Sequence, residues 1–334
     1  MQRITLWTGY SRLVATALAL GLGLAGCDPA ARETSSPAEA GGTEADGTAG
    51  GTEALPAVVA TSTLIADWVT QVGGDQVELT SILQPGADPH VYEPVPADSI
   101  AFEQADLILY NGYNLEPNLI RLLNAAGVNA QRLAVGEVVT PLSLEKEGRT
   151  VPDPHVWGDV SNAVPMVEAI RDELIELAPD QAELFTANAT AYIAELTALH
   201  SWIEAQTATI PASQRQLVTS HDAFQYYANA YGLTVAGTLI GLSTEEQPSA
   251  RTVQQLVESI RTLGVPAIFA ETTINPQLIT TVAAEAGVIL APTKLYSDSV
   301  GAAGSDGDSY LTMMAANTRT IVENLGGTVS APDF

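Results

Sequence analysis

Apolar, β-branched segments alternate with helix-like segments along most of this 334-residue chain. The strand-like segments lie near residues 57–61, 77–83, 106–110, 131–135, 215–220, 233–237, 266–271 and 287–292. Helical patterns such as LIADWVTQVGG and ARTVQQLVESIRTLG separate them. Apolar strands that alternate with helices predict parallel sheets covered by helices on both faces. The sequence therefore predicts an α/β fold with two lobes.

A single long helical pattern connects the two predicted lobes. It runs over residues 179–211, with Pro179 at its start and Pro211 just past its end. Its apolar residues recur at helical spacing on one face: Phe185, Tyr192, Leu196, Leu199 and Ile203. A helix of about 30 residues spans roughly 45 Å. We therefore expect a rigid bridging helix between an N-terminal lobe of residues 57–178 and a C-terminal lobe of residues 212–334.

The N-terminus predicts secretion and a lipid anchor. Residues 1–26 combine basic residues with an apolar run that is shorter than the roughly 20 residues of a membrane span. The run ends in LAGC, which resembles the lipobox of bacterial lipoproteins and makes Cys27 the expected lipidated first residue of the mature chain. An uncleaved anchor or a free thiol is the alternative. Residues 27–56 contain little to bury and predict a disordered tether.

The charge of the chain excludes one class of partner and fits one compartment. The formal net charge is −26, from 39 acidic and 13 basic residues. Nucleic-acid binding depends on basic patches, so no nucleic-acid partner is expected. An acidic surface attracts cations and suits a protein outside the cytoplasm, although the same charge also serves solubility alone. The sole cysteine excludes an intramolecular disulfide.

Three of the four histidines lie where loops or strand ends are expected. His90 and His155 occupy near-identical stretches, DPHVY and DPHVW, and His221 directly follows the strand-like RQLVTS. Asp298 lies just beyond the last predicted strand. Ligands in open α/β sheets bind outside the carboxyl ends of the strands. Each lobe thus supplies two candidate ligands, and the cleft between the lobes is where they could meet.

These residue types point to a transition metal. Neutral imidazoles bind such metals, and a carboxylate completes a four-coordinate shell. Prolines at positions 85, 89, 94 and 96 around His90, and at 152 and 154 before His155, reduce the conformational entropy that the loops lose on binding. A lone loop histidine is more often a surface residue, so the paired motifs carry the interpretation. Glu271 ends a predicted strand and is either an acceptor that orients a histidine or a structural residue.

Several stretches together resemble the metal-binding components of bacterial ABC importers for zinc and manganese, the TroA-like superfamily. They include ADWVTQVGGDQVELTSILQPGADPHVYEPVPAD, YNGYNLE, PDPHVWGDVSNA, TSHDAFQYYANAYGL and KLYSDSVG. The resemblance covers residues 57 to 326. It implies two Rossmann-like lobes bridged by one helix, and metal ligands at His90, His155, His221 and Asp298. It also implies a lipid-anchored, extracytoplasmic monomer that captures a metal ion and passes it to an ABC permease.

Two departures from that family leave the metal open. The stretch between the first two ligand histidines lacks the long His- and Asp-rich loop of many zinc members, whereas His221 stands where many manganese members carry Glu. Three imidazoles and one carboxylate favour Zn²⁺, with Mn²⁺ as the alternative. A zinc hydrolase is the rival function, although no HExxH motif occurs. A surface adhesin on the same scaffold is a third reading.

Overall fold

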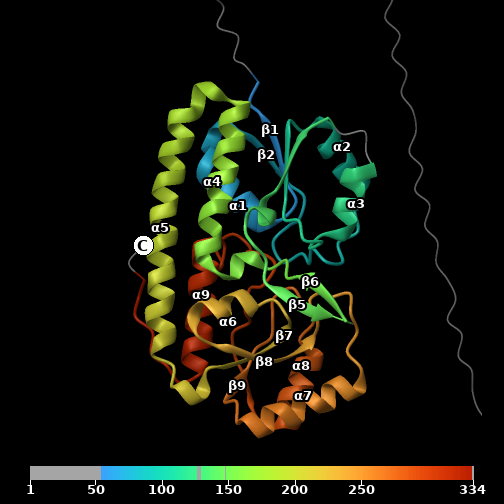
Figure 1. The fold of residues 1–334 in the computed structure, drawn as a ribbon, viewed down its shortest axis with the longest axis vertical. Coiled ribbons are helices and arrows are strands. Elements are labelled where there is room, and N and C mark those ends of the chain that lie inside the picture. Colours follow the sequence, from blue (N-terminus) through green and yellow to red (C-terminus); the bar gives the residue numbers. More distant parts are fainter. Residues whose placement is uncertain (1–53, 126–128, 147, 333–334) are drawn as a thin grey trace, which may run out of the picture. The chain divides into compact units, whose positions relative to one another are not determined.

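The segments predicted as strands in the first half form one four-stranded parallel sheet (Figure 1). The computed structural model describes residues 54–125, 129–146 and 148–332. The strand order is β2-β1-β3-β4, and every pairing is parallel. The strands are β1 (Ala57–Ala60), β2 (Glu78–Ser81), β3 (Leu107–Tyr110) and β4 (Gln131–Ala134).

Helices cover both faces of this sheet, because the two central strands are apolar on both faces. The helices of this half are α1 (Thr63–Gly73), α2 (Pro96–Gln104), α3 (Pro117–Ala125) and α4 (Val160–Leu177). Val58 and Leu107 pack in one core cluster with α1 and α4. Val59 and Ile108 point the other way, into a second cluster with α2 and α3. We call this half the N-terminal lobe.

Two elements of the N-terminal lobe differ from the sequence prediction. An antiparallel hairpin of β5 (Ser143–Lys146) and β6 (Arg149–Pro152) lies where no strands were predicted. The helix α4 follows it and was not predicted. Its pattern includes Pro165, which weakens a helix signal, but Asp159 caps the helix by accepting from the backbone N–H of Ser161.

The second half repeats the parallel arrangement with two longer and two shorter strands, and we call it the C-terminal lobe. Its strands are β7 (Gln216–His221), β8 (Thr234–Ile240), β9 (Ala267–Ile268) and β10 (Ile289–Leu290), paired β7 with β8 and β9 with β10. Its helices are α6 (Gln225–Tyr231), α7 (Ala250–Leu263), α8 (Gln277–Ala286) and α9 (Tyr310–Asn324). A hydrogen bond from Phe269 N–H to Val218 O places β9 beside β7.

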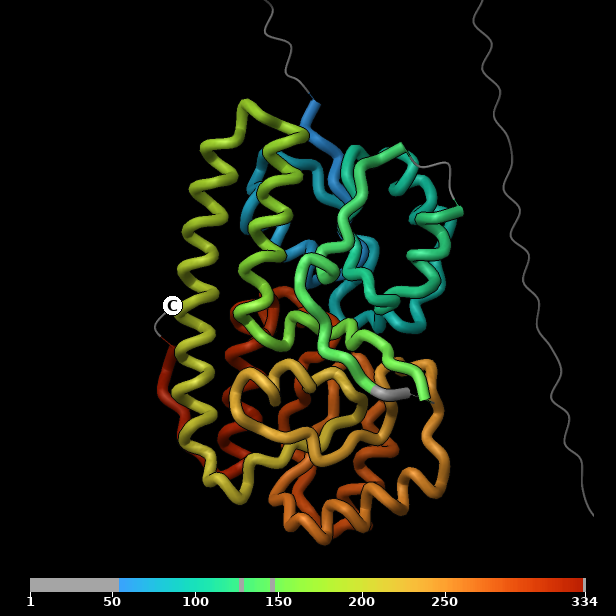
Figure 2. Tube along the Cα trace, in the orientation of Figure 1, coloured from blue at the N-terminus to red at the C-terminus, as the bar shows by residue number. Residues whose placement is uncertain are grey.

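The long helix α5 (Ala182–Ala208) lies along helices of both lobes (Figures 1 and 2). It packs against α1 and α4 of the N-terminal lobe and against α6 and α9 of the C-terminal lobe. All five residues of its predicted apolar face are buried. Asn188 donates to Val72 O at its N-terminal end, and Trp202 donates to Ser330 O near its C-terminal end. The helix therefore contributes to a core that contains residues of both lobes.

The predicted fold class, two α/β lobes with parallel sheets, is confirmed. Residues 53–334 form one compact unit. The predicted signal peptide, the lipidated Cys27 and most of the predicted tether fall outside the described residues. Among the described helices, none combines the length and apolar character that crossing a bilayer requires.

Candidate metal-binding site

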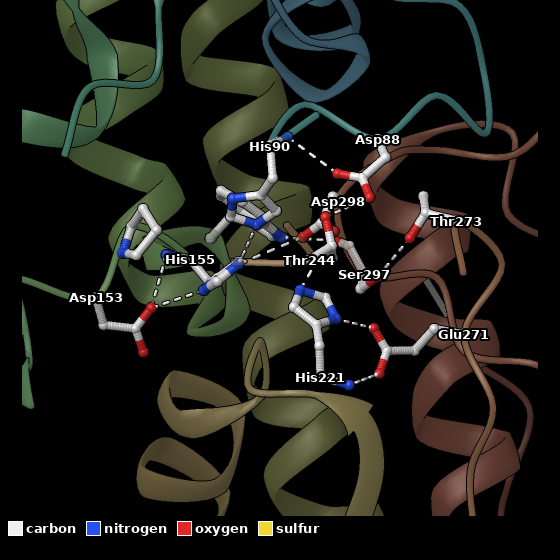
Figure 3. Close-up of polar contacts among 12 residues, drawn as sticks. Asp88, His90, Asp153, His155, His221, Thr244, Glu271, Thr273, Ser297 and Asp298 are labelled. Carbon is white, nitrogen blue, oxygen red and sulfur yellow. Dashed lines mark hydrogen bonds and ion pairs between the residues drawn. The ribbon is translucent and has the colours of Figure 1, made fainter. Parts of the chain in front are cut away.

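Four buried side chains from both lobes converge on one point between the lobes (Figure 3). His90 lies in the loop between β2 and α2, and His155 lies between β6 and α4. His221 is the last residue of β7, and Asp298 lies in the loop between β10 and α9. Each residue offers one ligand atom, and these atoms all lie within 4.8 Å of one another. The structure thus brings together all four residues that the sequence analysis selected as ligands.

Three of the distances among these atoms are close to those of a tetrahedral metal shell. Nε2 of His90 lies 3.2 Å from Nε2 of His155, which lies 3.5 Å from Oδ1 of Asp298. Nε2 of His221 lies 3.3 Å from Oδ2 of Asp298. Zinc–ligand bonds of 2.0–2.2 Å in a tetrahedron separate neighbouring ligand atoms by about 3.3–3.6 Å. A metal ion therefore fits this set of atoms with little rearrangement.

Three of the polar atoms that face this point lack a hydrogen-bond partner within the described part of the chain. Both carboxylate oxygens of Asp298 and Nε2 of His221 are buried without a hydrogen bond. Buried polar atoms without partners are rare, because their desolvation is not compensated. Such atoms are expected where a ligand supplies the missing interaction. Their arrangement favours a cation, since the carboxylate oxygens and imidazole nitrogens are electron-pair donors.

His221 is oriented by a carboxylate behind it. Glu271, which follows β9, accepts from Nδ1 of His221 through one oxygen and from the His221 backbone N–H, at 2.8 Å, through the other. Burial alone would lower the pKa of His221, but the carboxylates of Glu271 and Asp298 raise it well above its ordinary value. The structure therefore places Glu271 where an orienting acceptor would be, which leaves Nε2 of His221 facing the other ligand candidates.

The surroundings of His90 and Asp298 also set the protonation states of these two residues. Burial lowers the pKa of His90 to about 3, so this imidazole is neutral at physiological pH. Burial alone would raise the pKa of Asp298, but the neighbouring histidines, His221 first among them, hold it well below its usual range. Asp298 is therefore ionised and His90 is neutral, which are the forms that bind metals.

Two aspartates that sequence reasoning missed hold the ligand loops. Asp153 accepts from both the backbone N–H and Nδ1 of His155, at 3.0 and 2.8 Å. Asp88 accepts from the backbone N–H of His90 at 2.9 Å. The signal was present in the repeated Asp-Pro-His sequence, because an Asp side chain often accepts from the backbone N–H two residues later.

The fourth histidine lies outside the cluster. His200 is on α5, partly exposed, with Nδ1 3.1 Å from the Tyr231 hydroxyl group.

Trp157 packs edge-on against the ring of His155 and donates from Nε1 to Ser297 O at 3.0 Å. The His155 loop is thereby attached to the segment that carries Asp298. Trp157 is buried, so the site is closed on this side by an aromatic ring.

Comparisons with known proteins show which proteins this chain is similar to. Residues 58–324 match the sequence profile of the family described as "ZnuA: Zinc-uptake complex component A periplasmic". The manganese-binding lipoprotein MntA of Halalkalibacterium halodurans is 38% identical over 285 residues, which cover 85% of this chain and 93% of that protein. The metal ABC transporter substrate-binding lipoprotein SsaB of Streptococcus sanguinis is 34% identical over 80% of this chain and 88% of its own length.

Solved structures show the same similarity. The periplasmic zinc-binding protein TroA from Treponema pallidum superposes with a TM-score of 0.78 and 34% identity, over 81% of this chain and 99% of that one. The family is described as an uptake-complex component rather than an enzyme, so the comparisons do not favour a hydrolase. The chain belongs to the ZnuA family of periplasmic metal-uptake components, within the TroA-like superfamily.

Proposed function

We propose that this protein captures a divalent transition-metal ion outside the cytoplasmic membrane and delivers it to the permease of an ABC importer. The convergence of His90, His155, His221 and Asp298 carries the proposal. Four protein ligands can fill a tetrahedral shell, whereas a catalytic zinc site keeps a position open for water. The metal is therefore the cargo of the protein. The relatives named as metal ABC transporter and manganese-binding lipoproteins support this reading.

We propose Zn²⁺ as the ion that the site holds more tightly. Three imidazoles and one carboxylate at near-tetrahedral separations suit zinc. Nitrogen-rich sites also bind zinc more tightly than manganese along the Irving–Williams order.

Mn²⁺ is the second candidate, and one observation favours it. The two oxygens of Asp298 face different histidines, Oδ1 toward His155 and Oδ2 toward His221. A carboxylate in this position can bind through both oxygens and raise the coordination number, which suits an oxygen-preferring ion. Relatives named as manganese-binding lipoproteins support the same alternative.

The metal content of the purified protein tests the proposal. We expect about one zinc or manganese ion per chain by elemental analysis, and calorimetric titration of the stripped protein with both ions should give single-site binding. The variant His155→Ala should lose this binding, while His200→Ala should keep it. Absence of binding by the unmodified protein would overturn the proposed function.

We further propose that Cys27 carries a lipid anchor, that residues 27–56 tether the folded part, and that the protein acts as a monomer. The LAGC sequence and the lipoprotein names of relatives support the anchor. We also propose lobe boundaries at 57–178 and 212–334, on either side of a bridging segment of residues 179–211. Replacing Cys27 by Ser should move the protein from the membrane fraction to a soluble or unprocessed form. A wild-type protein found wholly in the soluble fraction would refute the anchor.

A further inference from the structure

The loop that carries His90 is the most exposed part of the metal site. Val91 is 43% exposed, and Gln84 to Gly86 on the other side of the histidine are also exposed. The stretch from Asp153 to Gly158, around His155, is buried throughout. Nδ1 of His155 and Nδ1 of His221 each form a hydrogen bond with a carboxylate. Within the described residues, no acceptor forms such a hydrogen bond with Nδ1 of His90. The position of His90 therefore depends on what holds its loop.

One contact from the opposite lobe holds the loop next to the histidine. The Thr244 hydroxyl group, in the segment between β8 and α7, donates to Oδ2 of Asp88 at 2.6 Å (Figure 3). The other oxygen of Asp88 accepts from the backbone N–H of His90. A single carboxylate thus links the main chain of His90 to the C-terminal lobe.

A second contact from the opposite lobe holds the same loop at Gly86, two residues before Asp88. Oγ of Ser299, the neighbour of Asp298, accepts from the backbone N–H of Gly86 at 2.7 Å and from the Thr63 hydroxyl group at 3.1 Å. The Thr63 hydroxyl oxygen in turn accepts from the backbone N–H of Val300 at 3.1 Å. Gly86 has φ of +83°, a backbone conformation that residues other than glycine rarely adopt. The loop is therefore held from the C-terminal lobe at two points, Gly86 and Asp88.

We infer that Thr244, acting through Asp88, and Ser299 hold His90 in the metal site from the opposite lobe, so that these three positioning residues set the rate of metal release. This inference rests on the proposed function, because it requires that His90 binds the metal. The two contacts form only while the loop and the C-terminal lobe keep this arrangement. A metal ion leaves once His90 withdraws, and the hydroxyl groups of Thr244 and Ser299 oppose that withdrawal. Asp88 and Thr244 also line a cavity of about 500 Å³, so solvent can compete for their hydrogen bond.

Stopped-flow release of zinc from the loaded full-length protein into excess chelator tests the inference. Thr244→Val and Ser299→Ala should each speed release roughly tenfold, the kinetic equivalent of losing one net hydrogen bond. Thr244→Ser keeps the hydroxyl group and should restore the wild-type rate. Thr281→Val is the matched control, because Thr281 lines the same cavity but donates only within α8.

The same measurement in a His90→Ala background separates positioning from general loosening. If Thr244 acts through His90, Thr244→Val should have no further effect on release once His90 is gone. An equal acceleration in both backgrounds, or a wild-type release rate for Thr244→Val, would overturn the inference while the proposed function stands. A wild-type protein that binds no metal would overturn both.

Discussion

The loops around His90 and His155 share the sequence Asp-Pro-His-Val, yet they use the aspartate differently. In both loops the carboxylate accepts from the backbone N–H of the histidine two residues later. Asp153 then bonds the ring of its own histidine through the same oxygen. Asp88 instead uses its second oxygen to accept from Thr244 in the opposite lobe. The motif thus orients the ring of His155 through Asp153, whereas it connects the His90 loop to the opposite lobe through Asp88.

The surroundings of the loops explain this difference. The His155 loop lies between the lobes, and Val156 and Trp157 belong to the core that both lobes share. The neighbours of His90, such as Leu83 and Tyr92, belong to a smaller cluster of the N-terminal lobe alone. Ligand orientation at His155 therefore follows from packing and a ring contact. At His90 it follows from a few hydrogen bonds across the lobes.

The largest effect should come from removing the buried ligand. His155→Ala should lower metal affinity at least about 100-fold, because loss of an orienting partner alone costs 10–100-fold. His200→Ala, on the exposed side of α5, should change affinity by less than about twofold. Calorimetric titration measures both, and circular dichroism of the metal-free proteins checks that each is folded. Similar losses for the two variants would show that our ligand assignment is wrong.

The two aspartates give the next effect and test the comparison directly. Asp153→Asn should lower affinity about 10–100-fold, because the amide no longer strengthens His155 as a ligand. Asp88→Asn should cost about tenfold or less, since it weakens one hydrogen bond and leaves the ring untouched. In a His90→Ala background the Asp88 variant should cost nothing more, while the Asp153 variant should keep its full cost. Equal costs in both backgrounds would mean that the two loops work alike.

The pH dependence should separate His90 from His221. The pKa of His90 is lowered to about 3, so this ring has no proton to lose above pH 5. The pKa of His221 is raised by Glu271 and Asp298 despite burial, so its proton must leave before a metal binds. Affinity should therefore rise with pH, about tenfold per unit for each proton displaced, between pH 5.5 and 7.5. Calorimetry in buffers of different ionisation enthalpy should count at least one proton and fewer than three.

Much of this arrangement could be predicted from the sequence, because it follows from local patterns. Strand–helix alternation predicted the lobes, and three histidines at loops or strand ends with Asp298 predicted the cluster. The hairpin β5–β6 could not be predicted, since its strands are short, β6 is largely exposed, and neither strand follows a clear apolar alternation. Thr244 lies 156 residues along the chain from its partner Asp88, and Ser299 lies 213 residues from its partner Gly86. Only the packing of the lobes determines such pairs.

A smaller effect concerns selectivity. His221→Glu should shift the zinc-to-manganese affinity ratio toward manganese, because a carboxylate is a harder ligand than an imidazole. The structure adds a complication, since Glu271 lies directly behind this position and would face a second buried carboxylate. The paired variant His221→Glu with Glu271→Gln should therefore show the larger shift. Titration with both ions decides it, and an unchanged ratio in the paired variant would assign selectivity to the geometry of the lobes.

The smallest effect concerns stability and lies behind the His155 loop. Oε1 of Glu116 accepts from the backbone N–H of Asn111 and from the Thr61 hydroxyl group. Asn111 donates to Pro154 O next to His155. Burial raises the pKa of Glu116 to about 7, although these hydrogen bonds oppose the shift.

The folded protein therefore keeps a proton on Glu116 that the unfolded chain loses at lower pH. The free energy of unfolding should fall as pH rises from about 4.5 to 7, by at most about 3 kcal/mol from this group. Glu116→Gln cannot ionise, so it should remove this part of the pH dependence. Denaturant unfolding of the metal-free proteins at pH 5 and pH 8 measures the difference. If the variant kept the same difference in unfolding free energy between pH 5 and pH 8, Glu116 would be ionised in the folded state. A charged carboxylate would then hold the network behind His155.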